Sequence, residues 1–126
     1  MMSDDGRPVF DLAALDRRTG GDRNLQIDVV RMFLEDCPSR VEAIRASVAG
    51  GDAAGLRATA HALKGAAAYL SAAFVVDAAA QLEQIGREGR MAEAVAAFER
   101  LDAAVKQLVP RLAALPVDLG GITDID

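Results

Sequence analysis

The sequence predicts an all-α protein with an antiparallel four-helix bundle core and an additional short N-terminal helix. Hydrophobic residues make up 52% of the chain and aromatic residues only 4%, and most of the hydrophobic fraction is alanine, leucine and valine. Alanine and leucine are strong helix formers. Apolar residues recur at helical spacing between breaks that contain glycine or proline. Long amphipathic helices joined by short breaks are typical of antiparallel bundles.

The first part of the chain predicts one short helix and one long helix. Asp11 and Asp22 are expected to be N-caps, because an aspartate side chain can accept a hydrogen bond from the free N–H groups of a first helical turn. The short helix is predicted over residues 12–18, and Pro38 in the long helix predicts a kink or a short break near Asp36. The long helix has apolar residues at helical spacing, namely Leu25, Val29, Val30, Phe33, Leu34, Val41, Ile44 and Val48.

Two further helices are predicted in the middle of the chain. A pair of glycines is expected to end the long helix, and Asp52, which follows the pair, is expected to cap a third helix over about 53–70. A fourth helix is predicted over about 72–85. Gly86 and Gly89 are expected to bracket the turn that follows it.

A fifth helix is predicted from about 91 to 108, and Pro110 suggests a bend near its end. We therefore expect a flexible N-terminus over residues 1–9, a helical bundle over 10–115 and an acidic, flexible tail over 116–126. The fifth helix has one apolar stripe, formed by Val95, Phe98, Leu101, Val105 and Leu108.

Composition and charge exclude several classes of function. The formal net charge of -5 argues against binding to nucleic acid and to anionic membranes, because both carry negative charge. The most apolar stretch, residues 66–76, is too short to span a bilayer, and residues 1–8 lack the pattern of a signal peptide. The single cysteine, Cys37, fits a reducing compartment and is interpreted as a small buried residue. We expect a soluble, cytoplasmic protein.

The third predicted helix carries the only histidine, His61, on the side away from the core. One narrow apolar stripe is expected to face the core, formed by Leu56, Ala60, Leu63, Ala67, Leu70 and Phe74. His61 lies roughly 140° from the middle of this stripe on a helical wheel. Lys64 and Arg57 lie one turn away on either side of it. The imidazole is therefore predicted to be exposed and flanked by two cations.

Gly65 lies directly above His61 on the exposed side of this helix. Glycine inside a helix is about 1 kcal/mol less favourable than alanine, so a reason other than helix stability is needed. We interpret it as clearance for an approach to the imidazole. A metal site is not expected, because there is no second histidine and Cys37 is far away in sequence. Ser71 does not complete a catalytic triad, which leaves His61 itself as the candidate nucleophile.

The stretch HALKGAA, residues 61–67, resembles the signature of histidine phosphotransfer (HPt) domains. In that signature, histidine is followed by any residue, leucine, lysine, glycine and two small residues. The resemblance covers roughly residues 9–112. It extends to residues 10–15, 20–22, 33–38, 51–52, 82–83 and 86–87.

The resemblance implies a phosphorelay function in two-component signalling. His61 would accept a phosphoryl group from the aspartate of a receiver domain and pass it to another receiver aspartate. Lys64 would stabilise the phosphoryl oxygens, and Glu83 would reach the imidazole from the neighbouring helix and orient it, although a solvated glutamate is the alternative. The chain would be a phospho-carrier rather than an enzyme. It would have no cofactor of its own, and Mg²⁺ is expected on the receiver partner.

Receiver domains of response regulators or hybrid histidine kinases are thus the expected partners, and a monomer suffices for this chemistry. The surface expected to contact them consists of Arg57, Ala58, Ala62, Gly65, Ala66 and Ala68. Two departures from the family pattern stand out. Ser71-Ala72 replaces the usual glycine-alanine, so the third helix is expected to end less sharply or to run on. The small residues Ala66 and Ala67 replace serines, so they have no hydroxyl to offer the phosphoryl group.

Three other interpretations compete with a free-standing phospho-carrier. The first is a helical interaction module that binds receiver or kinase domains without accepting phosphate, against which the intact His61, Lys64 and Gly65 speak. The second is a domain of a larger sensor or chemotaxis kinase, although the chain lacks a glycine-rich nucleotide loop. The third is a dimerisation bundle, which would need a large exposed apolar stripe. The sequence does not identify the receivers, the direction of flow or the pathway.

Overall fold

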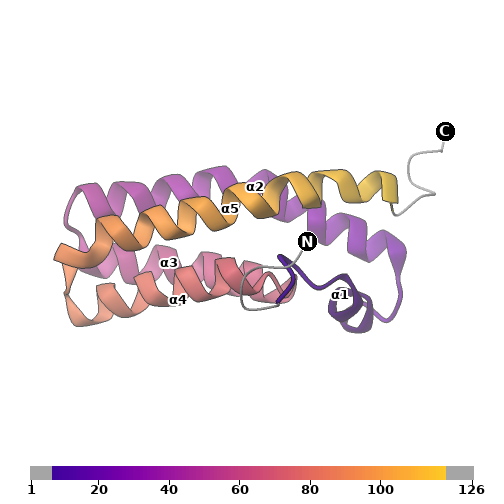
Figure 1. Cartoon of the computed structure of the whole chain (residues 1–126), viewed down its shortest axis with the longest axis horizontal. Helices are drawn as coiled ribbons and strands as arrows, with labels where there is room; N and C mark the ends of the chain where they lie inside the picture. Colours follow the sequence, from indigo (N-terminus) through magenta and orange to yellow (C-terminus); the bar gives the residue numbers. More distant parts are fainter. Residues whose placement is uncertain (1–6, 119–126) are drawn as a thin grey trace.

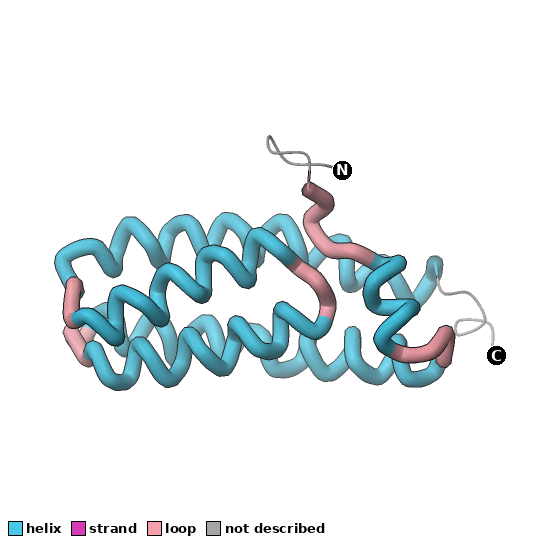
Figure 2. The backbone as a smooth tube through the Cα atoms, turned by 90° about the horizontal axis from the view of Figure 1, so that it is seen from below, coloured by secondary structure: helices cyan, strands magenta, loops and turns pink. Residues whose placement is uncertain are grey.

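The computed structural model describes residues 7–118 of the chain, with side chains to residue 115. Every element in this part of the chain is a helix, and the predicted fold class is confirmed. Figures 1 and 2 show α2, α3, α4 and α5 side by side, with α2 and α5 extending beyond α3 and α4 and with α1 beside this overhang. The elements in order are α1 (Leu12–Arg18), α2 (Arg23–Ala49), α3 (Ala53–Tyr69), α4 (Ala73–Glu88), the short 3₁₀ helix η1 (Met91–Glu93) and α5 (Ala94–Asp118).

The three predicted aspartate caps are confirmed. Asp11, Asp22 and Asp52 each accept a hydrogen bond from the backbone N–H three residues further on, over 3.0, 3.1 and 2.9 Å respectively. Each cap satisfies an N–H group that has no partner within the helix, and such a cap contributes about 1 kcal/mol to stability. The starts of α1, α2 and α3 are therefore fixed by local sequence.

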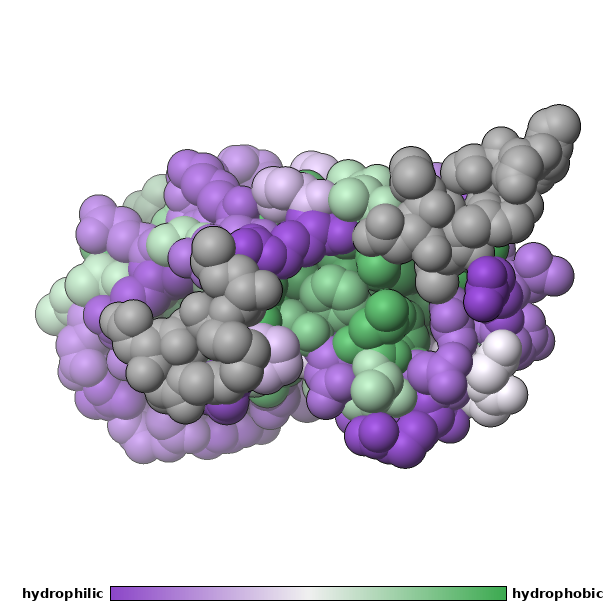
Figure 3. Space-filling model, turned by 45° about the vertical axis from the view of Figure 1, so that its right-hand side comes forward, coloured by the Kyte–Doolittle hydropathy of each residue, from purple (hydrophilic) through white to green (hydrophobic). Residues whose placement is uncertain are grey.

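The core follows the predicted apolar stripes with three exceptions. Leu25 on α2 and Val95 on α5 are exposed, and Phe74 belongs to α4, where it is half-buried. The stripe of α3 is fully buried and comprises Leu56, Ala60, Leu63, Ala67 and Leu70. On the face seen in Figure 3, apolar residues gather in a central patch with hydrophilic residues around it.

Neither proline breaks its helix, so the short break that was one of the two predictions for Pro38 is wrong. Pro38 lies inside α2, and Pro110 lies inside α5, which continues to Asp118. Each proline removes one backbone hydrogen bond. Both prolines are exposed, so water can reach the carbonyl that loses its partner. Packing of the buried faces of α2 and α5 then outweighs the local cost.

Gly86 is inside α4, which runs to Glu88, and the prediction that it brackets a turn is wrong. A Cβ atom at Gly86 would lie 2.6 Å from the backbone nitrogen of Arg57 and 2.7 Å from the carbonyl oxygen of Ala53. The glycine therefore permits α4 to approach the backbone of α3 closely. Gly89 ends α4 with a left-handed φ of 70°, as a glycine after a helix commonly does.

The end of α3 is sharp although Ser71 replaces a glycine there. Ser71 adopts a left-handed φ of 53°, and α4 begins two residues later. The Arg18 guanidinium donates hydrogen bonds to the Ser71 hydroxyl at 2.6 Å and to the Tyr69 carbonyl at 2.8 Å. The expected run-on of α3 is therefore absent, because α1 holds the turn by these two bonds.

The predicted domain boundaries differ slightly from the helical limits. Val9 is buried in the core, although it was assigned to the flexible N-terminus. Helix α5 continues three residues beyond the predicted limit at 115. Residues 1–6 and 119–126, which make up most of the two predicted flexible segments, lie outside the described part of the chain.

Candidate functional site

His61 projects from α3 into solvent, as the helical wheel predicted. Its side chain is 66% exposed, and Nδ1 of the imidazole lies 3.0 Å from Oε2 of Glu83 on α4. The predicted reach of Glu83 across to the histidine is thus present. Two helices contribute to the site, and the exposed ring has one nitrogen engaged by the protein.

Glu83 is the centre of a four-residue cluster, which we call the Glu83 cluster and which consists of Glu83, His61, Lys64 and Arg87. The Glu83 side chain is only 6% exposed. Its Oε1 lies 2.6 Å from Nζ of Lys64, and its Oε2 lies 3.2 Å from Nη2 of Arg87 as well as beside the imidazole. One buried carboxylate therefore contacts two cations and a ring nitrogen.

The close approach of α3 and α4 brings this cluster together. Gly86 lies three residues after Glu83, nearly one turn further along α4, and touches the backbone of α3 beside Arg57. Because the helices are so close there, the short Glu83 side chain reaches both His61 and Lys64. The predicted stripe of α3 turns Leu63 into the core, which leaves His61 and Lys64 on the flank beside α4.

The electrostatics of the cluster favour an ionised Glu83. The Lys64 ammonium group beside Oε1 holds the pKa of Glu83 below its usual value of 4.5, the bond from His61 acts in the same direction, and burial opposes both. An ionised carboxylate can only accept hydrogen bonds. Nδ1 of His61 must therefore donate the proton in this contact, and Nε2 carries the lone pair of the neutral ring. The nitrogen that could act as a nucleophile is therefore Nε2, which does not contact Glu83.

Two members of the cluster have contacts that the sequence did not predict. The ammonium group of Lys64 contacts Glu83, and its side chain is 33% exposed; its predicted role toward a phosphoryl group stays a prediction. Arg87 was not predicted as a site residue. Its position four residues after Glu83 on one helix is the spacing at which an acid and a base pair, so the sequence did contain the signal.

The predicted contact surface is divided among three parts of the molecule. Arg57 and Ala58 line a pocket of about 470 Å³ together with His61, Glu83, Arg87 and Ala54. Ala62 and Ala66 face the groove between α2 and α3, and Ala68 faces a pocket beside residues 7–11. All six predicted residues are exposed except Ala66, which is half-buried. They surround His61 but do not form one flat patch.

Gly65 has no packing reason within the described part of the molecule. A Cβ atom at this position would meet no atom within 4 Å. An alanine would therefore fit there and would also favour the helix. The geometry is consistent with the clearance that the sequence suggested.

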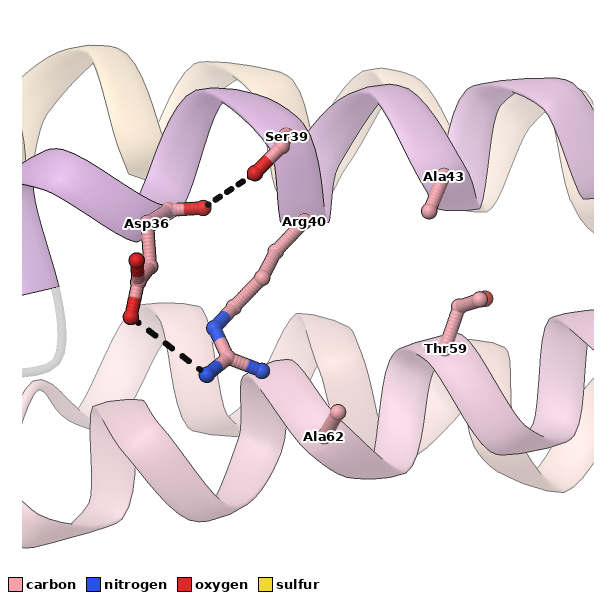
Figure 4. Close-up of a pocket in the computed structure, with 6 residues that line it drawn as sticks. All are labelled: Asp36, Ser39, Arg40, Ala43, Thr59 and Ala62. Atoms are coloured by element: carbon pink, nitrogen blue, oxygen red, sulfur yellow. Dashed lines mark hydrogen bonds and ion pairs between the residues drawn. The ribbon is translucent and has the colours of Figure 1, made fainter.

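The groove between α2 and α3 contains a charged pair that was not predicted as part of the site. Figure 4 shows Arg40 extending from α2 toward α3, near Ala62. Its Nη2 lies 3.8 Å from a carboxylate oxygen of Asp36. The spacing of four residues again contained the signal. This long, partly exposed pair contrasts with the short contacts around Glu83.

The described residues form neither a metal-binding cluster nor a membrane-spanning helix. Over residues 7–118, no group of three or more histidine, cysteine, aspartate or glutamate side chains is arranged to hold a metal ion. Among the helices described, none has the length and apolar character needed to cross a bilayer.

Comparison with known proteins gives one family match and one similar solved structure. The family model of the Hpt domain matches residues 28–111. The fold is similar to the crystal structure of histidine-containing phosphotransfer protein B (HptB) from Pseudomonas aeruginosa PAO1, with a TM-score of 0.82 and 22% sequence identity, over 88% of this chain and 96% of that chain. No curated protein matches the chain. At 22% identity, the structural similarity concerns the fold.

Proposed function

The chain belongs to the Hpt domain family of two-component signalling, and we propose that it carries phosphoryl groups between receiver-domain aspartates through His61. The observation that supports this proposal most strongly is the state of the imidazole. The ring is exposed, its Nδ1 is engaged by a buried, ionised carboxylate, and its Nε2 faces away from that carboxylate. This arrangement offers one nucleophilic nitrogen to an approaching partner.

In the transfer step one bond forms and one bond breaks, and no proton moves to or from Nε2. The lone pair of Nε2 attacks the phosphorus of a receiver aspartyl phosphate, so that an N–P bond forms. The P–O bond breaks, and its electron pair leaves with the aspartate carboxylate. The proton on Nδ1 stays in its hydrogen bond to Glu83. The reverse step passes the phosphoryl group to a second receiver, so the chain is a carrier that returns to its starting state.

Alignment and charge are the main requirements of this reaction, because the transition state is loose and its charge lies on the equatorial oxygens. Glu83 holds the ring in one orientation and one tautomer. Lys64, held beside the ring by Glu83, adds positive potential near the phosphoryl group. We expect Mg²⁺ on the receiver, whose own residues would bind it.

Docking is expected to use the exposed side of α3. Gly65 leaves room above His61, and Ala58, Ala62, Ala66 and Ala68 add small side chains around it. Arg57 adds a positive charge at one edge. A small surface of this kind suits a transient complex, and a monomer is sufficient for it.

Incubation with a panel of phosphorylated receiver domains tests the proposal. Mass spectrometry should find an acid-labile phosphoryl adduct on His61 and a matching loss from the receiver. The His61→Gln variant should take up none while keeping its helical circular dichroism. The alternative, a module that binds receivers without accepting phosphate, predicts binding in both forms and an adduct in neither.

A further inference from the structure

Arg87 is the member of the Glu83 cluster whose role the reaction above leaves open. Glu83 carries one negative charge, whereas Lys64 and Arg87 together carry two positive charges, and the carboxylate is 6% exposed. A single cation would neutralise this carboxylate. The second cation adds like-charge repulsion with the first. The cluster therefore has an excess of positive charge beside the nucleophile before any substrate arrives.

The two cations hold Glu83 in different ways. Lys64 contacts Oε1 at 2.6 Å, while Arg87 contacts Oε2 at 3.2 Å and shares that oxygen with Nδ1 of His61. If Lys64 left, Oε1 would lose its cation. If Arg87 left, Oε2 would still accept the hydrogen bond from the imidazole. Arg87 is thus the cation that can move without leaving a carboxylate oxygen unpaired.

Arg87 also faces the space that a phosphoryl group on the ring would enter. Arg57, His61, Glu83 and Arg87 line one pocket, and Lys64 is not part of its lining. The Arg87 side chain is 45% exposed, against 33% for Lys64. Its guanidinium donates to Gln84 Oε1 at 2.8 Å through Nη1 and contacts Glu83 through Nη2. Further N–H groups of its planar fork are available for phosphoryl oxygens.

Phosphorylation itself changes the competition for Oε2. A ring that carries a proton on Nδ1 and a phosphoryl group on Nε2 is formally cationic, so its hydrogen bond to Glu83 becomes charge-assisted and stronger. At the same time, the phosphoryl group brings about two negative charges to the pocket. Both changes favour movement of the Arg87 guanidinium from Glu83 to the phosphoryl oxygens.

We propose that Arg87 is a catalytic residue that exchanges partners during the reaction, from Glu83 in the resting site to the phosphoryl group as it bonds to Nε2. This proposal rests on the proposed function of His61. Lys64 remains on Glu83 throughout and acts on the phosphoryl group through its potential. On release of the phosphoryl group, the ring loses its charge and Arg87 returns to Oε2.

Phosphorylation by phosphoramidate tests the proposal without a receiver. Attack by Nε2 breaks the P–N bond of phosphoramidate and releases ammonia. We expect Arg87→Ala to slow uptake on His61 by about tenfold or more, as loss of a charged hydrogen bond at the transition state implies. Arg87→Lys should restore part of the rate. Arg100→Ala should behave like the parent chain, because Arg100 bonds to Gln81 of α4 outside this pocket.

A second measurement separates direct contact from support of Glu83. ³¹P NMR of the phosphorylated chain follows the titration of the phosphoryl group, and a neighbouring guanidinium lowers its midpoint. The midpoint should therefore be higher in Arg87→Ala than in the parent and unchanged in Arg100→Ala. Slower uptake with an unchanged midpoint would show that Arg87 acts only through Glu83, and an unchanged rate would also overturn the proposal.

The outcomes for Arg87 and for the proposed function remain distinct. Phosphorylation of His61 by phosphoramidate without transfer from any receiver would contradict the relay function alone. A parent chain that phosphoramidate does not phosphorylate on His61 would contradict both the nucleophile and the contact with Arg87.

Discussion

Gly65 and Gly86 both lie inside helices that are otherwise rich in alanine, but the structure gives them opposite surroundings. A Cβ atom at Gly65 on α3 would meet nothing within 4 Å, whereas one at Gly86 on α4 would press against the backbone of α3 at 2.6 and 2.7 Å. Gly86 therefore serves the packing of the chain itself. Gly65 has no such use in the described structure, and we propose that clearance for a partner is the reason for it.

The two glycines also meet two different requirements of the candidate site, namely its assembly from α3 and α4 and access to the imidazole. Close packing at Gly86 brings Glu83 within reach of His61 and Lys64, and so it builds the site from inside. Open space at Gly65 leaves the imidazole accessible from outside. A larger residue at Gly86 should therefore lower the stability of the fold, whereas a larger residue at Gly65 should weaken the binding of a partner.

The largest effect is expected from Gly86→Ala. The added methyl group must push α4 away from the backbone of α3, and overpacking of this kind costs about 1–3 kcal/mol. Alanine is favoured over glycine inside a helix by roughly 1 kcal/mol, and this gain offsets only part of an overpacking cost at the upper end of that range. We expect a net loss of about 2 kcal/mol in the free energy of unfolding, measured by urea denaturation. Unchanged or increased stability would show that the helices are not held this closely.

Gly65→Leu should leave the fold intact and weaken the complex with a receiver. The side chain would occupy the space above His61 that the partner needs. We expect the dissociation constant to rise about tenfold, which corresponds to about 1.4 kcal/mol, as measured by calorimetry. If Gly65→Leu bound receivers as tightly as the parent, the clearance explanation would be wrong.

Gly65→Ala should stabilise the chain, in contrast to the same substitution at Gly86. Alanine is favoured over glycine in an exposed helix by up to about 1 kcal/mol, and nothing opposes the added methyl group. Urea denaturation of the two alanine variants side by side therefore measures the difference directly. If both alanine variants became more stable, or both less stable, the two glycines would not have the different roles assigned to them.

Ser71 extends the comparison to a position where the chain lacks a glycine. Its left-handed φ of 53° costs a residue with a side chain roughly 1 kcal/mol. Ser71→Gly should remove this cost but lose the bond from Arg18, giving a net gain below about 1 kcal/mol. Ser71→Ala loses the bond and keeps the strain, so it should be the less stable of the two in thermal denaturation. The reverse order would show that the hydroxyl outweighs the backbone strain.

The smallest effect is expected from the ionisation of Glu83, which is one acid among many. Its pKa is lower in the folded chain than its usual 4.5, so the ionised form is bound more favourably by the fold. This contribution is fully present above about pH 4.5 and is lost as the pH falls through the lower folded value. Glu83→Gln should therefore flatten the acid limb of stability against pH. An identical acid limb in both chains would contradict the shift.

The sequence predicted the elements governed by local chemistry more reliably than those governed by packing. Asp11, Asp22 and Asp52 were identified as caps because the bond spans only three residues. The role of Gly86 could not be found this way, because a glycine three residues before another glycine also fits a turn. Only the contact with the backbone of α3 at Ala53 and Arg57, which are far from Gly86 in sequence, shows why this glycine is needed.

The candidate site was predicted in the same uneven way. The helical wheel of α3 placed His61 in solvent, because the spacing of the buried apolar stripe defines which face of the helix is exposed. The partner of Lys64 depends on how α4 approaches α3, which the pattern of α3 alone does not contain. Arg87 had a visible spacing from Glu83, but many exposed pairs share that spacing, so only the burial of Glu83 distinguishes it.

The central claim is that an ionised Glu83 holds Nδ1 of His61 and leaves Nε2 as the nucleophile. Long-range ¹H–¹⁵N NMR of the chain after phosphorylation by a receiver tests it most directly, because the spectrum identifies the nitrogen that carries phosphorus. The predicted result is a phosphoryl group on Nε2, with the proton retained on Nδ1. A phosphoryl group on Nδ1, or on a residue other than His61, would contradict the account.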